Sequence, residues 1–232
     1  MILAMAGFAF EDLFIKILSS HLPISEIIII LGFTGSVVFL IIAIIQREPI
    51  IHKDALDKHL IMRTIFELLG AVFFVTAIAL TPLSSASAIL QITPLLVTIG
   101  AVIFFKEKVG WRRWSAVFVG FIGVLLILRP GFEGFMPESI FALLGSLFLA
   151  ARDLATRAMK TSLSSVTIAL YAFIAFGISG VLIIPFNSPM IVPTTNLIIY
   201  FIGASIFGVI AYYSLVTSSR IGEMSVISPF RY

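Results

Sequence analysis

Long apolar runs fill this chain, and short polar or turn-forming stretches separate them. A hydrocarbon core of about 30 Å requires about 20 apolar residues in a helix. On that measure the pattern predicts nine membrane spans, the last of them incomplete: residues 2–19, 24–45, 60–80, 83–105, 112–129, 138–158, 165–186, 196–216 and 221 onward. We therefore expect an all-α integral membrane protein whose sequence stops inside its ninth span, short of a tenth.

Composition supports a membrane protein. Hydrophobic residues make up 60% of the chain, charged residues 12%, and the mean hydropathy is +1.16, whereas soluble domains carry about 25% charged residues. The absence of cysteine excludes disulfides and cysteine metal sites. The net charge of +3 comes from basic residues between the spans, so it indicates topology and not a nucleic-acid partner.

Basic residues are concentrated in every second connection between the predicted spans, which places most of them on one side of the predicted membrane. The connections after spans one, three and seven carry none, and the connection after span five carries only Arg129. The other connections contain Arg47, Lys53, Lys58, Lys106, Lys108, Arg112, Arg113, Lys160 and Arg220. Cytoplasmic loops are enriched in Lys and Arg. We therefore expect a multi-pass protein of the cytoplasmic (inner) membrane with its N-terminus in the cytoplasm.

Two polar signatures occur twice. Asp12-x-x-x-Lys16 in the first span is repeated 141 residues later as Asp153-x-x-x-Arg157 in the sixth. Thr93-Pro94 in the fourth span is answered by Ser228-Pro229 in the ninth. The pattern predicts two copies of a five-span unit, residues 1–130 with spans one to five and residues 138–232 with spans six to nine, the second copy being truncated. Because five is an odd number, the second copy enters the membrane from the opposite side, which is the inverted repeat found in many secondary transporters.

Few ionisable residues lie inside the spans: Glu11, Asp12, Lys16, Arg63, Glu67, Arg152, Asp153 and Arg157. Each central charge costs roughly 2.5–3.5 kcal/mol on insertion scales, so such residues are candidates for function. Two interpretations remain open. Asp12 with Lys16, and Asp153 with Arg157, have the spacing of ion pairs within one helix. Alternatively, both acids face a shared cavity near the middle of the bilayer.

The remaining candidates follow from spacing and from proline. Arg63 and Glu67 are four residues apart and are expected to pair. Glu11 points about 100° away from Asp12 around the helix, so we expect only one of them to face a narrow cavity. Pro94, in the fourth span, removes a backbone donor and frees a carbonyl near Leu90.

Pro229 repeats the proline kink in the ninth span. Gln91 and Tyr212 are candidates for neutral contacts with a substrate, although packing explains Tyr212 equally well. The sequence contains no phosphate loop, nucleophile elbow or zinc helix, and His52 with His59 is a weak metal pair. We therefore expect no enzymatic activity, no metal and no cofactor.

The stretch that begins at Leu83 resembles a known protein family. One stretch of the chain resembles the EamA domain of the drug/metabolite transporter superfamily: LSSASAILQITPLLVTIGAVIFFKEKVGWRRWSAVFVGFIGVLLILRP. The features that carry the resemblance are a mid-helix proline, Glu107 and a span containing Gly120 and Gly123. The opening EDLFIKIL is similar to the first helix of that family. The resemblance implies a ten-helix carrier of two repeats around a central cavity, working by alternating access. Some relatives are similar to metabolite exporters, and others to uptake carriers for riboflavin or S-adenosylmethionine.

The leading hypothesis is a secondary transporter for a small polar or amphipathic metabolite. Asp12 or Asp153 would carry a coupling proton, and Lys16, Arg63 or Arg152 would contact anionic groups. The lipid bilayer is the expected environment, and a homodimer is a candidate assembly. The alternative is a non-transporting membrane scaffold or partner-binding subunit, in which the intramembrane pairs serve only helix assembly, and it predicts no water-filled cavity.

Overall fold

The computed structural model describes residues 1–51, 57–106, 136–159 and 163–221, together with residues 110, 111, 114, 115, 118, 119, 122, 123 and 126. The predicted fifth span and the predicted ninth span, with Pro229, lie largely or wholly outside these residues. The inner part of the 46–59 connection is also outside them.

The described chain is helical. Its elements are α1 (Ile2–Ser19), α2 (Ile24–Ile45), α3 (Lys58–Leu80), α4 (Leu83–Leu90), α5 (Thr93–Phe105), α7 (Ser139–Ala158), α8 (Ser165–Leu182), a 3-10 turn (Ile184–Phe186) and α9 (Thr195–Ile221). The predicted spans match these helices closely. The largest differences are that the seventh span ends at Leu182 before the 3-10 turn, and that the eighth extends to Ile221.

Six helical segments of the described chain are long and apolar enough to cross a membrane: Ile24–Ile45, Lys58–Leu80, Leu83–Phe105, Ser139–Ala158, Ser165–Leu182 and Thr195–Arg220. The α1 helix has a comparable length of 18 residues but carries Glu11, Asp12 and Lys16. The protein is therefore a multi-pass all-α membrane protein.

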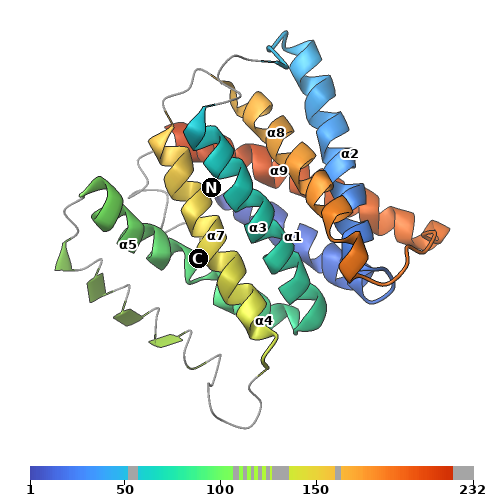
Figure 1. The fold of residues 1–232 in the computed structure, drawn as a ribbon, viewed down its shortest axis with the longest axis horizontal. Helices are drawn as coiled ribbons and strands as arrows, with labels where there is room; N and C mark the ends of the chain where they lie inside the picture. The colour runs from blue at the N-terminus through green and yellow to red at the C-terminus, as the bar shows by residue number, and fades with distance from the viewer. Residues whose placement is uncertain are drawn as a thin grey trace.

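Three helix pairs form the body of the molecule. The α1 helix packs along α9, α2 along α8, and α3 along α7, as Figure 1 shows for α2 with α8 and for α3 with α7. Each pair joins a helix that precedes residue 106 to one that follows residue 138. The two halves of the chain are therefore interleaved, and a space at the centre is bounded by both.

The α2 and α8 helices approach so closely that their backbones touch. Gly32 faces the backbone of Gly177, and a methyl group at position 32 would overlap the backbone of Gly177. Two turns further along α2 and one turn away on α8, the Phe39 and Phe173 rings lie 5.3 Å apart between centroids. Small residues allow this contact, which is the usual way in which membrane helices gain packing energy.

The fourth predicted span is a broken helix. It ends as α4 at Leu90 and resumes as α5 at Thr93, with Gln91 and Ile92 between them. Pro94 lacks an N–H group and cannot donate to the Leu90 carbonyl. The predicted proline-induced break is confirmed, and broken helices of this kind occur at the binding sites of membrane carriers.

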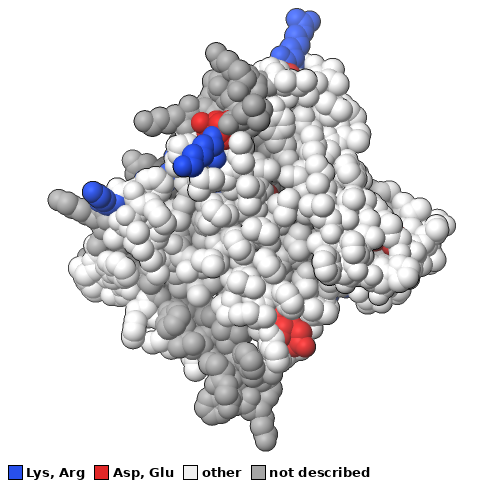
Figure 2. All heavy atoms as spheres, viewed as in Figure 1, with Lys and Arg blue, Asp and Glu red and all other residues white. Residues whose placement is uncertain are grey.

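Basic side chains lie mainly toward one end of the molecule (Figure 2). On the face drawn in Figure 2, Lys and Arg lie mainly at the upper end, where α2 and α7 end and α3 and α8 begin (Figure 1). Large apolar side chains are exposed along the helices, for example Val37 at 55% and Ile199 at 69%. An apolar girdle with basic residues displaced toward one end suits a helix bundle in a bilayer.

Candidate functional site

A cavity of about 350 Å³ lies between the helix pairs. We call it the chamber. Its lining combines apolar and aromatic side chains with five ionisable groups, and residues from both halves of the chain contribute: Met5, Phe8, Ala9, Glu11, Asp12, Ile15, Glu67, Ala71, Phe74, Val75, Ser87, Leu90, Gln91, Thr93, Leu149, Arg152, Ala172, Phe173, Phe176, Gly208, Tyr212 and Leu215. The volume is within the range of small-molecule sites.

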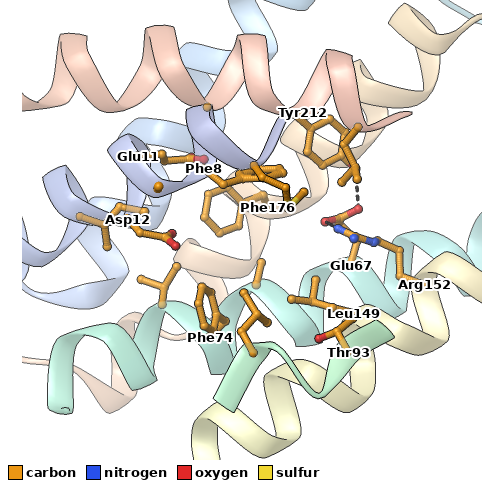
Figure 3. Close-up of a pocket in the computed structure, with 18 of the residues that line it drawn as sticks. Phe8, Glu11, Asp12, Glu67, Phe74, Thr93, Leu149, Arg152, Phe176 and Tyr212 are labelled. Atoms are coloured by element: carbon orange, nitrogen blue, oxygen red, sulfur yellow. Dashed lines mark hydrogen bonds and ion pairs between the residues drawn. The ribbon is translucent and has the colours of Figure 1, made fainter. Parts of the chain in front are cut away.

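The acids of α1 line one side of the chamber. Glu11 and Asp12 both contribute to its lining, and Figure 3 shows them on the side opposite Glu67 and Arg152. The expectation that only one of the two could face the cavity is wrong, because the chamber is wide enough to meet two neighbouring positions of α1. No ion pair within the described residues involves Glu11 or Asp12.

Lys16 does not neutralise Asp12. Its Nζ donates to the carbonyl oxygens of Ile78 at 2.8 Å, Ala79 at 3.3 Å and Thr81 at 2.8 Å. These carbonyls lie at the C-terminal end of α3, where helix carbonyls lack intrahelical donors and a positive charge is favourable. The interpretation of Asp12 and Lys16 as an ion pair is therefore wrong, and Lys16 joins α1 to α3.

An ionic cluster lies on the other side of the chamber. Arg152 of α7 donates from Nη1 to Glu67 Oε1 of α3 at 2.9 Å. The second oxygen of Glu67 accepts from the Tyr212 hydroxyl and lies 3.3 Å from Arg63 Nη2. Arg63 Nη2 also donates to the Tyr212 oxygen at 2.6 Å. The predicted Arg63–Glu67 pair is confirmed, and it belongs to a larger cluster.

Asp153 supports Arg152 from behind. Its Oδ1 accepts from Arg152 Nε at 2.9 Å and lies 2.9 Å from Nη2. Asp153 is buried but does not line the chamber. The expectation that Asp12 and Asp153 share one cavity therefore holds for Asp12 only. The Arg157 guanidinium lies 5.0 Å from the centre of the Phe105 ring.

The broken helix adds neutral polar groups to the chamber. Gln91, in the break, and Thr93, at the start of α5, both contribute to the lining. Thr93 is buried, and its hydroxyl has no hydrogen-bond partner among the described residues. Pro94 is buried beside it and does not line the chamber.

Of the predicted site residues, the structure brings Asp12, Glu67, Gln91, Arg152 and Tyr212 to the chamber. Arg63 and Asp153 lie behind this layer as partners of Glu67 and Arg152. Lys16 lies away from it, at the end of α3. Within the described residues, no group of three His, Asp or Glu side chains could hold a metal ion.

Sequence reasoning missed the apolar lining and Gly208, although a signal for them existed. The spacing of 141 residues that relates Asp12 to Asp153 also relates five pairs of lining residues: Phe8 and Leu149, Glu11 and Arg152, Glu67 and Gly208, Ala71 and Tyr212, and Phe74 and Leu215. Applied to the predicted Glu67, Arg152 and Tyr212, that spacing leads to Gly208, Glu11 and Ala71.

The known proteins that this chain resembles are transporters, which is consistent with a cavity inside the helix bundle. Residues 1–129 match the model of the EamA-like transporter family. The chain is 25% identical to an S-adenosylmethionine uptake transporter of Rickettsia bellii over 234 residues, which is 100% of this chain and 78% of the relative. It is 27% identical to a riboflavin transporter of Vibrio cholerae over 177 residues, covering 73% of this chain and 57% of the relative.

A third similarity is to a pseudopaline exporter of Pseudomonas aeruginosa, 26% identical over 200 residues, covering 84% of this chain and 67% of the relative. These relatives are transporters and not enzymes. The scaffold alternative predicted no water-filled cavity, and the structure has a cavity beside the charged residues. The chain therefore belongs to the EamA-like transporter family, whose members transport small molecules across membranes.

Proposed function

We propose that this protein carries a small charged or amphipathic metabolite across the cytoplasmic membrane by alternating access, and that the substrate binds in the chamber. The observation that carries the proposal is a cavity of about 350 Å³ inside a helix bundle, with acids on one side and an arginine on the other. Charged groups inside a membrane are costly and typically mark a substrate or ion pathway.

The chamber is proposed to lie between two inverted repeats, residues 1–130 with spans one to five and residues 138–232 with spans six to nine. The helix pairing supports this. If α1, α2 and α3 correspond to α7, α8 and α9, the α1–α9 and α3–α7 pairs exchange places and the α2–α8 pair maps onto itself. A two-fold relation between repeats has this property, and the five lining pairs spaced by 141 residues follow the same correspondence.

We further propose nine spans in this sequence, with the N-terminus in the cytoplasm. The distribution of Lys and Arg between the spans supports that orientation, because basic residues favour the cytoplasmic side. The gathering of basic side chains at one end of the molecule in Figure 2 agrees with it. In this orientation, the cytoplasmic side is the end at which α2 ends and α3 begins.

S-adenosylmethionine is the first substrate to test. It combines a flat heterocycle with a sulfonium cation and an amino-acid group. The chamber offers aromatic side chains at Phe8, Phe74 and Phe176, which suit a heterocycle and a cation, and two acids of α1 without a basic partner among the described residues. Relatives that align with all of this chain are S-adenosylmethionine uptake transporters.

A proton is the proposed coupling ion, and Asp12 is its proposed carrier. Asp12 lines the chamber, whereas Asp153 is held by Arg152 outside the lining. An acid that reaches the substrate space can exchange its proton with either side as the access alternates. We therefore assign Asp153 the structural role of holding Arg152, and Asp12 of α1 the role of carrying the coupling proton.

Flux into proteoliposomes tests the proposed function. The full 232-residue chain is reconstituted, and uptake of radiolabelled S-adenosylmethionine and of riboflavin is compared with protein-free liposomes. We expect saturable uptake of S-adenosylmethionine that adenosine alone inhibits poorly. Uptake of riboflavin alone would contradict the substrate but support the carrier. Uptake of neither, at any imposed pH gradient, would contradict the proposal.

A further inference from the structure

We propose that Arg152 binds a carboxylate of the transported molecule, and that Glu67 occupies this position when the chamber holds no substrate. This inference rests on the proposed function and adds a chemical requirement, because it predicts that the substrate carries a carboxylate. For S-adenosylmethionine, this would be the carboxylate of the amino-acid group.

Arg152 is oriented for exchange at the chamber. Asp153 contacts its Nε and Nη2 from outside the chamber lining, and this contact fixes the plane of the guanidinium. Nη1 is bound by Glu67, which itself lines the chamber. A guanidinium is a planar set of donors that matches a carboxylate. A ligand carboxylate can therefore replace that of Glu67 while Asp153 stays in place.

Glu67 can release Arg152 without losing its other partners. Its second oxygen accepts from the Tyr212 hydroxyl and lies 3.3 Å from Arg63 Nη2. Arg63 is 2% exposed and does not line the chamber, so a ligand does not compete for it. Displacement therefore exchanges one charge-assisted hydrogen bond of Arg152 for another of the same kind.

The cluster has more donors than acceptors. Arg63 Nη1 is buried and has no hydrogen-bond partner in the described part of the chain. Buried donors without partners are rare in proteins, and each one calls for an explanation. One additional carboxylate would supply two further acceptor oxygens, so that Glu67 could turn toward Arg63 while the ligand binds Arg152.

Comparison with the equivalent positions in the other half of the molecule argues against a purely structural role for the Arg152–Glu67 pair. The positions 141 residues away from Arg152 and Glu67 are Glu11 and Gly208, which also meet at a crossing of two helices, α1 and α9. That crossing forms with a glycine and without an ion pair. The equivalent helix crossing therefore forms without an ion pair, which indicates that the Arg152–Glu67 pair serves binding and not only packing.

Equilibrium binding to the full chain in lipid nanodiscs tests the assignment with a matched pair of ligands. S-adenosylmethionine and its decarboxylated analogue share the adenosine and the sulfonium and differ in the carboxylate. We expect the wild-type chain to bind the carboxylate-bearing ligand roughly 10- to 100-fold more tightly, as charge-assisted hydrogen bonds imply. Arg152→Gln should abolish this preference, and the matched control Arg157→Gln should keep it.

Glu67→Gln gives a result that misfolding cannot imitate. Because the competing charge is removed, we expect this variant to bind S-adenosylmethionine several-fold more tightly than the wild type, with the decarboxylated analogue unchanged. Equal wild-type affinity for the two ligands, a preference that persists in Arg152→Gln, or weaker binding of S-adenosylmethionine by Glu67→Gln would each overturn the assignment.

A second readout separates this inference from the proposed substrate. Phenylglyoxal labelling of Arg152 in the Glu67→Gln chain is measured by mass spectrometry, with L-methionine or L-methioninol as the protecting compound. Protection by L-methionine alone supports the carboxylate site even if the wild-type chain does not bind S-adenosylmethionine. Equal protection by both compounds, or protection by neither, overturns it.

Discussion

The carboxylate of Glu11 on α1 lies directly against the backbone of Gly208 on α9. A methyl group built at Gly208 would overlap the Glu11 carboxyl group. The absence of a side chain at this position therefore lets an acid of one half rest on a helix of the other, at the chamber wall.

Gly208→Ala should displace the Glu11 carboxyl group from α9. Only the end of the Glu11 side chain lies in the way of the added methyl, so α1 and α9 can stay in place. We expect little change in the thermal unfolding temperature in detergent and a several-fold loss of substrate affinity. Gly123→Ala is the control, because an added methyl meets no described atom within 4 Å there. If both alanine variants behave alike, the close contact has no functional importance.

Lys16→Met should destabilise the protein without changing ligand selectivity. The ammonium group satisfies three carbonyls at the end of α3, and losing such bonds costs about 1–3 kcal/mol. Thermal unfolding measures the loss, and Lys58→Met, at an exposed position at the start of α3, is the control. A selective loss of binding to carboxylate-bearing ligands would show instead that Lys16 contacts the substrate.

Thr93→Val should leave the folded protein as stable as before or more so by about 1 kcal/mol, because the hydroxyl is buried with no partner among the described residues. If that hydroxyl binds the substrate, affinity falls several-fold at the same time. Thr98→Val is the control on the same helix, since the Thr98 hydroxyl donates to the Pro94 carbonyl at 2.9 Å. Equal destabilisation by both variants contradicts this view of Thr93.

Asp12→Asn and Asp153→Asn should affect different properties, the first the pH response of uptake and the second the stability of the fold. Asp12 reaches the chamber, so its amide variant should remove the response of uptake to an imposed pH gradient while stability changes little. Asp153 holds Arg152 in the interior, and removing one partner of a buried pair costs about 3 kcal/mol. Uptake into proteoliposomes and thermal unfolding distinguish the two. Unchanged pH dependence in Asp12→Asn would remove the coupling assignment.

The sequence predicted the helices well because runs of apolar residues have few alternatives in a bilayer. The break at Gln91 was also predictable, since Pro94 cannot donate a hydrogen bond. Side-chain partners were less accessible. The spacing of Asp12 and Lys16 suggested an ion pair, but tertiary packing brings the end of α3 to Lys16, and three carbonyls compete successfully for its ammonium group.

The cluster around Glu67 shows the same limit. The spacing of Arg63 and Glu67 identified one pair, whereas Arg152 and Tyr212 join it from helices that follow 85 and 145 residues later. Nothing local in the sequence encodes that meeting.

The most direct test of the chamber uses the absence of native cysteine. Single cysteines at Ala71 and Leu215, which line the chamber, and at Ile199, which is 69% exposed on α9, are treated with a membrane-impermeant thiol reagent in proteoliposomes. We expect labelling at positions 71 and 215, protection there by substrate, and no labelling at position 199. Failure of the reagent to reach positions 71 and 215 from either side would contradict a substrate chamber between the two halves.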